Sequence, residues 1–518
     1  MHSNHDASRR HFLRQAGIMS ALTGTAAPLA LNLAALGSAA AQTAGEYRAL
    51  VCLFFYGGND SFNMVLPMDR ASWNAYTQTR TQAPDPIALL AAGTPPVPTA
   101  AAGSPARLGG VLPVRPYGAR AYTQSLHPLL GNLQAMFNND ARLAIVSNIG
   151  PLILPTTKAQ YALASHPKPA RLFSHNDQQN TWQALGPEGT SVGWAGRMGD
   201  VLASQNTRPV FTAISATGNA VWLSGNTVKQ YQVNSTGAVP LGVNTAGQVF
   251  GSADVGAALQ RLSTLATSAH PFEVDSGAVA RRSIDAEVVL RTAMRPASDA
   301  AFGTMPATGP YNANNDPKLR YDNPLTGVTA ANTVAQQFQV VARLVDAGLR
   351  GASGCTRQVF FVSLGGFDSH DFQNRTQADL LARVDQAMKY FDDTLGALNA
   401  RNQVTTFTAS DFGRTFTSNG DGTDHGWGSH QFVMGGAVRG GNVYGRFPLL
   451  AVKNTNNNNF DGSPDQLGNG SLLPQISVDQ LGNTLGTWLG LSSTQLLDIF
   501  PNLANFDASV HNLGFMRT

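Results

Sequence analysis

Cysteine is scarce in this sequence of 518 residues, which contains only Cys52 and Cys355. Two cysteines cannot form the disulfide framework of a small secreted domain, and the chain has no C-x-x-C-H motif or cysteine cluster for haem or iron–sulfur binding. No G-x-G-x-x-G motif follows a predicted strand, so no sequence feature indicates a redox cofactor. Because both cysteines lie within or beside apolar runs, two buried free thiols fit the sequence at least as well as one disulfide.

Charge is also sparse, since Asp, Glu, Lys and Arg together make up 13% of the chain. Beyond residue 41, 32 Lys and Arg residues stand against 31 Asp and Glu residues. This balance provides no basic surface for nucleic acid or anionic lipid, so we expect neither as a partner. With 52 glycines and many Asn and Gln residues, the surface must be polar mainly through amides, hydroxyls and backbone, which is typical of a loop-rich secreted protein.

The sequence lacks a long uninterrupted apolar run. The uncharged stretch 15–37 is rich in Ala and Leu, but Gly17, Gly24, Pro28 and Asn32 interrupt it, which makes it too weakly apolar for a membrane span. No later segment is predicted to cross a membrane. We therefore expect no stable membrane span in the chain beyond residue 41.

The N-terminus has the features of an export signal. Residues 8–14 have the sequence SRRHFLR, which matches the S-R-R-x-F-L pattern of proteins carried by the twin-arginine translocase. Residues 39–41 form an A-x-A cleavage site before Gln42. We predict that residues 1–41 are a signal peptide, cleaved after Ala41, and that the mature protein is periplasmic or extracellular. The alternative is an uncleaved membrane anchor.

Short apolar runs rich in Val, Ile, Phe and Thr predict buried strands at 49–56, 142–149, 209–215, 358–364 and 403–409. Between the last two strands, residues 378–400 carry apolar side chains at helical spacing, so strand, helix and strand form a parallel crossover unit. Further helices are predicted at about 332–349 and within 253–294 and 479–499. These elements predict an α/β fold, a three-layer sandwich with a mainly parallel central sheet.

No internal repeat or two-domain boundary is evident, so residues 42–518 are predicted to form a single α/β domain. Surface insertions are expected at about 74–125 and 453–470. They include the Pro-, Ala- and Gly-rich stretch 83–107 and the NTNNNN stretch 454–459. Neither insertion is expected to have a core of its own.

Three predicted strands are followed by segments that contain an aspartate, and histidines lie in or near them. Ligands bind at the carboxyl ends of strands in open parallel sheets, because loop side chains and helix N-termini converge there. Carboxylates with imidazoles are the ligands of a divalent metal, and imidazole favours a transition metal over calcium. The alternative is that each aspartate caps a turn or helix. The predicted metal ligands are Asp60, Asp368, His370, Asp411, His425 and His430.

The segment LFSHNDQQ places Ser174 and His175 directly before a predicted helix. A serine at a helix N-terminus can act as a nucleophile when a metal lowers its pKa, and the helix amides favour an incoming anion. An N-cap serine without a catalytic role fits the sequence equally well.

Several longer motifs occur in one order along residues 49–447. They include SHNDQQ, GWAGRM, GNAVWLSG, GFDSHD, SDFGRT and TDHGWGSHQFVMGGAVRGG. In this set the chain resembles the family of domains of unknown function numbered 1501, which is itself similar to the alkaline phosphatase and sulfatase superfamily. The resemblance implies an alkaline phosphatase-like fold and a nucleophile beside two divalent metals that cleaves phosphate or sulfate esters.

The motif order implies that Ser174 is the nucleophile and that Asp60, Asp368, Asp411 and the histidines bind metal. One departure lies at 411–413, where the superfamily usually has Asp-His-Gly and this chain has Asp-Phe-Gly, so a ligand of the second metal is missing. Arg414 could supply fixed positive charge near that place. His175 or His430 could replace the absent ligand, or only one metal binds.

Two functions follow as hypotheses. The first is an exported hydrolase of phosphate or sulfate esters that uses one or two divalent ions (Zn, Mn, Ca or Mg), with Ser174, His175 and Arg414 as catalytic residues. Its substrate would be an anionic ester, which could be a carbohydrate. The second is a non-catalytic extracytoplasmic protein of the same fold that binds a polysaccharide or a partner protein. The missing histidine of the Asp-His-Gly motif favours the second hypothesis.

Overall fold

The computed structural model describes residues 46–517, apart from 83–84, 119–120, 122, 245, 266–269 and 457–458. The predicted signal peptide and its cleavage site lie outside these residues. Within the described residues, ten strands form one sheet in the order β14-β5-β13-β12-β1-β11-β6-β7-β8, with β15 paired to β5. The strands are β1 Arg48–Tyr56, β5 Leu143–Gly150, β6 Ala213–Ser215, β7 Tyr231–Asn234, β8 Gly237–Ala238, β11 Arg357–Gly365, β12 Val404–Ser410, β13 Ser429–Met434, β14 Asn442–Tyr444 and β15 Ile476–Ser477.

The centre of the sheet is parallel. Strand β1 pairs in parallel with β11 on one side and with β12 on the other, and β6 continues the parallel order beyond β11. Strand β13 runs antiparallel to both β12 and β5. The carboxyl ends of β1, β11 and β12 therefore lie side by side at one edge of the sheet.

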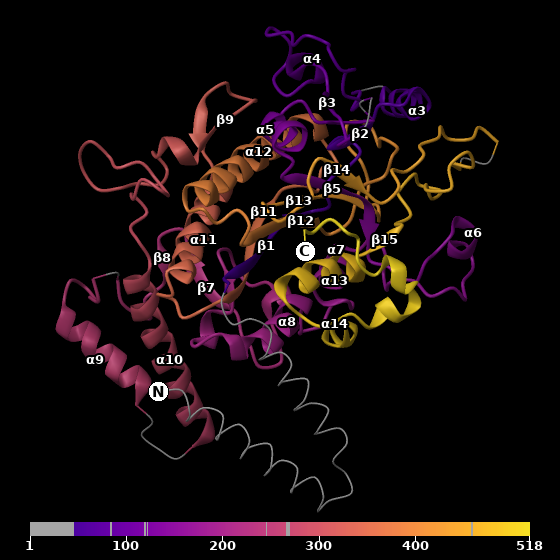
Figure 1. Cartoon of the computed structure of the whole chain (residues 1–518). Helices are drawn as coiled ribbons and strands as arrows, with labels where there is room; N and C mark the ends of the chain where they lie inside the picture. The colour runs from indigo at the N-terminus through magenta and orange to yellow at the C-terminus, as the bar shows by residue number, and fades with distance from the viewer. Residues whose placement is uncertain are drawn as a thin grey trace, which may run out of the picture.

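Strand β1 shows why the fold has three layers. Its side chains alternate between two buried clusters, with Val51, Leu53 and Phe55 in one and Leu50 and Phe54 in the other. The first cluster includes residues of α11 (Thr333–Leu349) and α12 (Gln373–Ala397), and the second includes residues of α8 (Trp194–Leu202), α13 (Val478–Leu489) and α14 (Ser493–Ile499). Figure 1 shows these helices on opposite sides of the sheet. The predicted α/β sandwich with a mainly parallel sheet is confirmed.

Most predicted elements are present. The predicted crossover is β11, α12 and β12, and the regions 253–294 and 479–499 contain α9 (Ala253–Thr264), α10 (Pro271–Ala293), α13 and α14. The strand predicted at 209–215 is shorter, because residues Pro209–Phe211 form a 3-10 turn and only Ala213–Ser215 pair as β6. Pro209 has no backbone N–H to donate to a neighbouring strand, which explains the late start.

Further short elements surround the sheet. The helices are α3 Arg70–Arg80, α4 Pro105–Leu108, α5 Gly131–Ala135, α6 Lys158–Tyr161 and α7 His175–Ala184. Strands β2 Val65–Pro67, β3 Leu112–Val114 and β4 Gln124–Leu126 form a small second sheet, and β9 Arg320–Asp322 pairs with β10 Thr329–Ala331.

The two sequence insertions share a hydrophobic cluster with Phe62, Leu66 and Leu472, which lie outside them. Tyr76, Leu89 and Val111 of the first insertion pack in one buried cluster with Phe460 of the second. Phe416, from the segment after β12, completes the contact with ring centroids 5.9 Å from Phe460. Proline, alanine and glycine thus dominate the composition of these insertions without preventing a few large apolar side chains from meeting.

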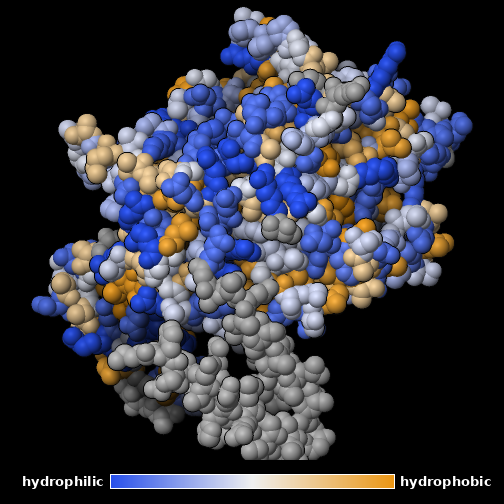
Figure 2. Space-filling model, viewed as in Figure 1, coloured by the Kyte–Doolittle hydropathy of each residue, from blue (hydrophilic) through white to orange (hydrophobic). Residues whose placement is uncertain are grey.

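Both cysteines are buried free thiols, so the alternative of a disulfide is not realised. Among the described helices, none combines the length and the apolar character that a membrane span needs. Figure 2 shows a face on which hydrophilic residues predominate and hydrophobic residues form separate patches.

Candidate functional site

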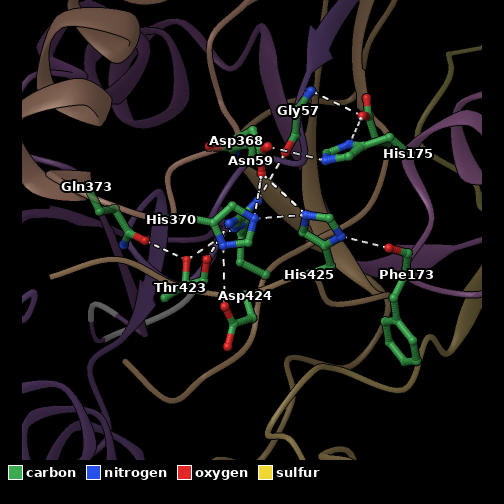
Figure 3. Close-up of polar contacts among 12 residues, drawn as sticks. Gly57, Asn59, Phe173, His175, Asp368, His370, Gln373, Thr423, Asp424 and His425 are labelled. Carbon is green, nitrogen blue, oxygen red and sulfur yellow. Dashed lines mark hydrogen bonds and ion pairs between the residues drawn. The ribbon is translucent and has the colours of Figure 1, made fainter. Parts of the chain in front are cut away.

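Asp368 is the centre of a polar cluster at the carboxyl edge of the parallel strands. Its carboxylate lies 3.4 Å from Nε2 of His175, 3.1 Å from Nε2 of His370 and 3.4 Å from Nε2 of His425. We call these four residues the Asp368 cluster. They come from the segments that follow β11 and β12 and from the first turn of α7, and Figure 3 shows them pointing toward one another. The Asp368 side chain is 44% exposed, so solvent and ligands can reach the cluster.

His175 is the first residue of α7, and its ring is held from behind. Its Nδ1 lies 2.8 Å from Oδ2 of Asp411, a fully buried carboxylate that also accepts from Gly57 N–H and from Nε2 of Gln179. The hydrogen bond to Asp411 raises the pKa of His175 above its usual value. In the neutral ring, with Nδ1 donating to Asp411, Nε2 carries the lone pair. That atom is buried, has no hydrogen-bond partner among the described residues and lies 3.4 Å from Asp368.

His425 is fixed in the same way by a backbone group. Its Nδ1 lies 2.7 Å from the carbonyl oxygen of Phe173, which can only accept a hydrogen bond. Its Nε2 in the neutral ring is therefore a lone pair, and this atom faces the cluster. Burial lowers the pKa of His425, which favours the neutral, ligating form.

His370 meets His425 nitrogen to nitrogen. The two Nε2 atoms are 3.0 Å apart, and Nδ1 of His370 lies 3.3 Å from Oδ1 of Asp424. If neutral His370 donates from Nδ1 to Asp424, its Nε2 lone pair faces the Nε2 lone pair of His425. If it donates from Nε2 instead, its Nδ1 lone pair faces a carboxylate. A proton on His370 or a cation between the rings removes this conflict.

Arg414 is fully buried and holds Asp368 in place. Its Nη1 donates to Asp368 at 2.7 Å and to the carbonyl of Gly57 at 3.1 Å, and its other donors bind the hydroxyl and carbonyl of Thr423. Burial alone would raise the pKa of Asp368, but the hydrogen bond and charge of Arg414 outweigh it and hold that pKa below its usual value. Arg414 therefore holds Asp368 in position and favours its ionised form. It has no pair of free N–H groups left to bind a ligand.

A close backbone approach makes this arrangement depend on one glycine. Gly57, which follows β1, has φ +113°, a conformation that side chains other than glycine rarely adopt. A Cβ atom there would lie 2.4 Å from the backbone nitrogen of Asp368. The absence of a side chain thus lets the exits of the neighbouring strands β1 and β11 come together.

Three residues of the cluster have the geometry of a metal site. One ligand atom each of His175, Asp368 and His425 lies within 4.8 Å of the others. Metal-binding histidines usually donate their second ring nitrogen to a carboxylate or carbonyl, as His175 does to Asp411 and His425 does to Phe173. Two imidazole nitrogens with one carboxylate oxygen suit zinc or another transition metal better than calcium or magnesium. Among the described residues, this is the group with suitable spacing.

Asp60, which we predicted to bind metal, forms a buried ion pair instead. Its carboxylate forms a two-point ion pair with Arg80, at 2.5 and 3.1 Å, and both side chains are completely buried. It also accepts from the backbone N–H of Phe62 and from Nε2 of Gln373. With two donors on each oxygen, the carboxylate has no free lone pair for a metal, so the prediction fails for Asp60.

His430 is also not part of the cluster. Strand β13 buries it, its Nδ1 accepts from the backbone N–H of Asn148, and its ring stacks on Phe447 with centroids 4.7 Å apart. Burial lowers its pKa to about 3. A neutral histidine packed in the interior cannot replace the missing ligand, so this prediction fails as well.

Two other predicted residues have roles different from those expected. Asp411 stands behind His175 and orients it, so its contact with a metal would be indirect. Ser174 is the N-cap residue of α7, but its side chain does not accept from the helix amides. Its Oγ donates to Oδ2 of Asp177 at 2.9 Å instead.

Some residues that support the site escaped the sequence analysis. Gln179 lies four residues after His175 on the same face of α7, a spacing that could have identified it. Asp424 adjoins His425 in the sequence and was visible in the GTDH motif. The carbonyl of Phe173 and the ion pair of Arg80 have no sequence signal, because both depend on how distant segments fold together.

Comparison with solved structures gives only distant likenesses. A crystal structure of Ps i-CgsB in complex with k-i-k-neocarrahexaose is 10% identical, covers 90% of this chain and 77% of that chain, and has a TM-score of 0.32. BT33494S-sulf of Bacteroides thetaiotaomicron is 9% identical, covers 87% and 74%, and has a TM-score of 0.32. BT1596, described as a 2-O GAG sulfatase, is 12% identical, covers 86% and 71%, and has a TM-score of 0.24. Scores this low do not bear on function.

Comparison with curated proteins finds no match. A family profile, in contrast, matches residues 47–462, which include every residue of the Asp368 cluster. The chain therefore belongs to the family described as Protein of unknown function (DUF1501).

Proposed function

We propose that this protein is an exported metal-dependent hydrolase of phosphate or sulfate esters, related in fold to the alkaline phosphatase and sulfatase superfamily. The observation that carries the proposal is the convergence of Nε2 of His175, Nε2 of His425 and the carboxylate of Asp368, with both rings anchored at their other nitrogen. Such a set holds a divalent cation of the zinc or manganese type, with His370 as a further ligand beside it.

A divalent cation at this place would polarise an ester oxygen and neutralise its charge. The protein supplies the surrounding electrostatics. Three carboxylates, those of Asp368, Asp411 and Asp424, stand against the single guanidinium of Arg414. These groups are thus net negative while the imidazoles are neutral, and one dication would neutralise them. They would then no longer repel an anionic ester, and the amide end of α7 beside His175 would favour the same charge.

Ser174 is the proposed nucleophile, since it directly precedes His175 and its hydroxyl donates to Asp177. A carboxylate that accepts the hydroxyl hydrogen is a suitable acceptor for that proton when the oxygen attacks. Ser174→Ala should then abolish turnover while leaving metal binding intact. Unchanged turnover in this variant would assign the attack to water.

The test of the proposed function uses the purified mature chain, residues 42–518. Metal content would be measured by mass spectrometry, and aryl phosphates and aryl sulfates would be assayed with added Zn²⁺, Mn²⁺, Ca²⁺ and Mg²⁺. We expect bound metal and turnover of at least one ester class, both lost in Asp368→Asn. Absence of metal together with no turnover under any of these ions would refute the proposal.

A non-catalytic binding protein is the second candidate. It is favoured by Arg414, a residue expected to act on a substrate, which donates instead to Asp368, Gly57 and Thr423 within the chain. In that case the double variant Asp368→Ala, His425→Ala would keep its binding to a polysaccharide or partner protein. Loss of biological activity in that variant, with folding intact by circular dichroism, would contradict a purely binding role.

Export by the twin-arginine translocase and cleavage after Ala41 remain part of the proposal, as does a single domain from 42 to 518. Replacement of Arg9 and Arg10 by lysine should keep the precursor in the cytoplasm. N-terminal sequencing of the exported protein should begin at Gln42.

A further inference from the structure

A large hollow is lined in part by the segment that directly follows His370. It has a volume of about 770 Å³, within the range of small-molecule sites, and lies between the first insertion and the N-terminal turn of α12. Most of its wall is apolar and includes Trp73, Ile87, Leu89, Ala102 and Phe372. The insertion at about 74–125 is therefore not just a surface excursion, since it forms one wall of a binding-sized cavity.

The hollow and the cluster share the same two loops. Phe372 and Gln373 line the hollow, and they follow His370 by only two and three residues. Gln373 also accepts from the hydroxyl of Thr423 at 2.5 Å, and Thr423 in turn accepts from Nε of Arg414 at 3.2 Å. Figure 3 shows Gln373 and Thr423 next to His370. The segment from His370 to Gln373 thus connects the cluster to the wall of the hollow.

Phe372 is held in an unusual way at the rim of this hollow. Its side chain is 70% exposed, and its backbone is left-handed, with φ 52° and ψ 35°. This conformation is unfavourable for a bulky residue and persists only when its surroundings enforce it. Here its N–H donates to the carboxylate of Asp421 at 2.9 Å. Phe372 also borders a second hollow of about 390 Å³.

Most of the wall of the larger hollow is apolar, but Thr77, Asp85, Ser104, Arg375 and Asp421 also line it. Asn374 donates to the carbonyl of Pro86 at 2.9 Å. A saccharide, which carries a hydroxyl on most of its carbons, would leave polar groups unpaired against the apolar part of this wall.

We propose that this hollow receives the apolar alcohol portion of the substrate, an aryl or medium-length alkyl group, while the phosphate or sulfate lies at the Asp368 cluster. This rests on the proposed function for the position of the charged group, and it narrows the substrate class from any anionic ester to esters of apolar alcohols. Trp73 and Phe372 provide the aromatic contacts.

The test separates binding in the hollow from chemistry at the cluster. Isothermal titration calorimetry on the mature protein would use 1-octanol, octyl sulfate and ethyl sulfate. Octanol and octyl sulfate should bind, and Phe372→Ala or Trp73→Ala should weaken both by roughly tenfold, the value expected for losing one buried aromatic contact. Phe272→Ala, on α10, is the matched control, because Phe272 is 82% exposed and does not line the hollow.

Asp368→Asn distinguishes the two proposals. It should abolish turnover and leave the affinity for octanol unchanged, because octanol has no charged group for the cluster. If the protein binds octanol but hydrolyses no ester, the apolar site stands and the proposed hydrolase function is overturned. The apolar site is overturned if octanol does not bind. It is also overturned if Phe372→Ala and Trp73→Ala bind octanol as tightly as the parent chain does. The apolar site is likewise overturned if these variants weaken the binding of a sulfated oligosaccharide and not the binding of octanol.

Discussion

Two aspartates that follow neighbouring parallel strands have contrasting environments in this protein. Asp60, after β1, is completely buried and accepts four hydrogen bonds, two of them from Arg80. Asp368, after β11, is 44% exposed and lies among three imidazoles. The sequence around each is a Gly-rich strand exit, so the local signal is the same. What differs is the covering segment, because an insertion sends Arg80 over one carboxylate and leaves the other open.

The largest expected effect is on the buried pair. Asp60→Asn leaves the guanidinium of Arg80 buried without its counter-charge, and breaking such a pair typically costs about 3–5 kcal/mol. Urea denaturation followed by circular dichroism should show that loss in the free energy of unfolding. Asp368→Asn should cost less, because water reaches Asp368 and Arg414 keeps carbonyl acceptors. Equal losses in the two variants would remove the distinction between a structural and a functional aspartate.

Metal affinity should depend on the cluster and not on Asp60, which is the reverse of the pattern expected for stability. His425→Ala removes a ligand and should weaken Zn²⁺ binding by roughly a hundredfold or more, since even outer partners of a ligand contribute tenfold or more. Asp60→Asn, if enough folded protein is obtained, should bind Zn²⁺ as tightly as the parent chain. Calorimetric titration with Zn²⁺ measures both. Weakened binding in Asp60→Asn would place Asp60 in the metal site after all.

A smaller effect is expected from the carboxylate behind His175. Asp411→Asn keeps the shape of the side chain, but its amide can donate to Nδ1 and favour the ring form with hydrogen on Nε2. Zn²⁺ affinity should fall by roughly tenfold, the range for an outer partner of a ligating histidine. Gln179→Ala, which removes only one neutral donor to Asp411, is the milder control. An unchanged affinity in Asp411→Asn would show that His175 is not a ligand.

The last effect, which is expressed per pH unit, concerns the acid stability that the buried His430 confers. Its folded pKa of about 3 lies below the unfolded value of 6.5, so the unfolded chain takes up the proton first. The contribution of His430 to the free energy of unfolding is complete above pH 6.5. It falls by about 1.4 kcal/mol per pH unit as pH drops toward 3. His430→Gln, which keeps an acceptor for the N–H of Asn148, should flatten the slope by that amount.

Only the difference between parent and variant is diagnostic in that experiment. Asp385 and Asp479 are buried, and their pKa values are raised to about 6 and about 7. Their contribution has the opposite sign, since the folded state holds the proton as pH falls toward 3.8. Urea denaturation at pH 4, 5, 6 and 7 would resolve the slopes, and identical slopes for parent and His430→Gln would contradict a neutral buried His430.

The sequence by itself determined the layers of this fold and the edge of the sheet where the site lies. Strand and helix periodicities are local properties, so β1, β11, α12 and β12 could be predicted from runs of side chains, and Pro209 shortened β6 for an equally local reason. The parallel order then fixes which loops share an edge. Asp368, His370 and His425 lie in those loops, with polar atoms 3.0–3.4 Å apart.

Tertiary structure alone decided which of the candidate residues work together. Asp60 and His430 have the right side chains in the right segments, but Arg80 saturates one and strand β13 buries the other. Asp411 does not face the other cluster residues directly, because it bonds Nδ1 of His175 from behind. The hollow at Phe372 depends on an insertion folded against α12. Ligand geometry, burial and cavities arise from contacts between residues hundreds of positions apart, which no local pattern encodes.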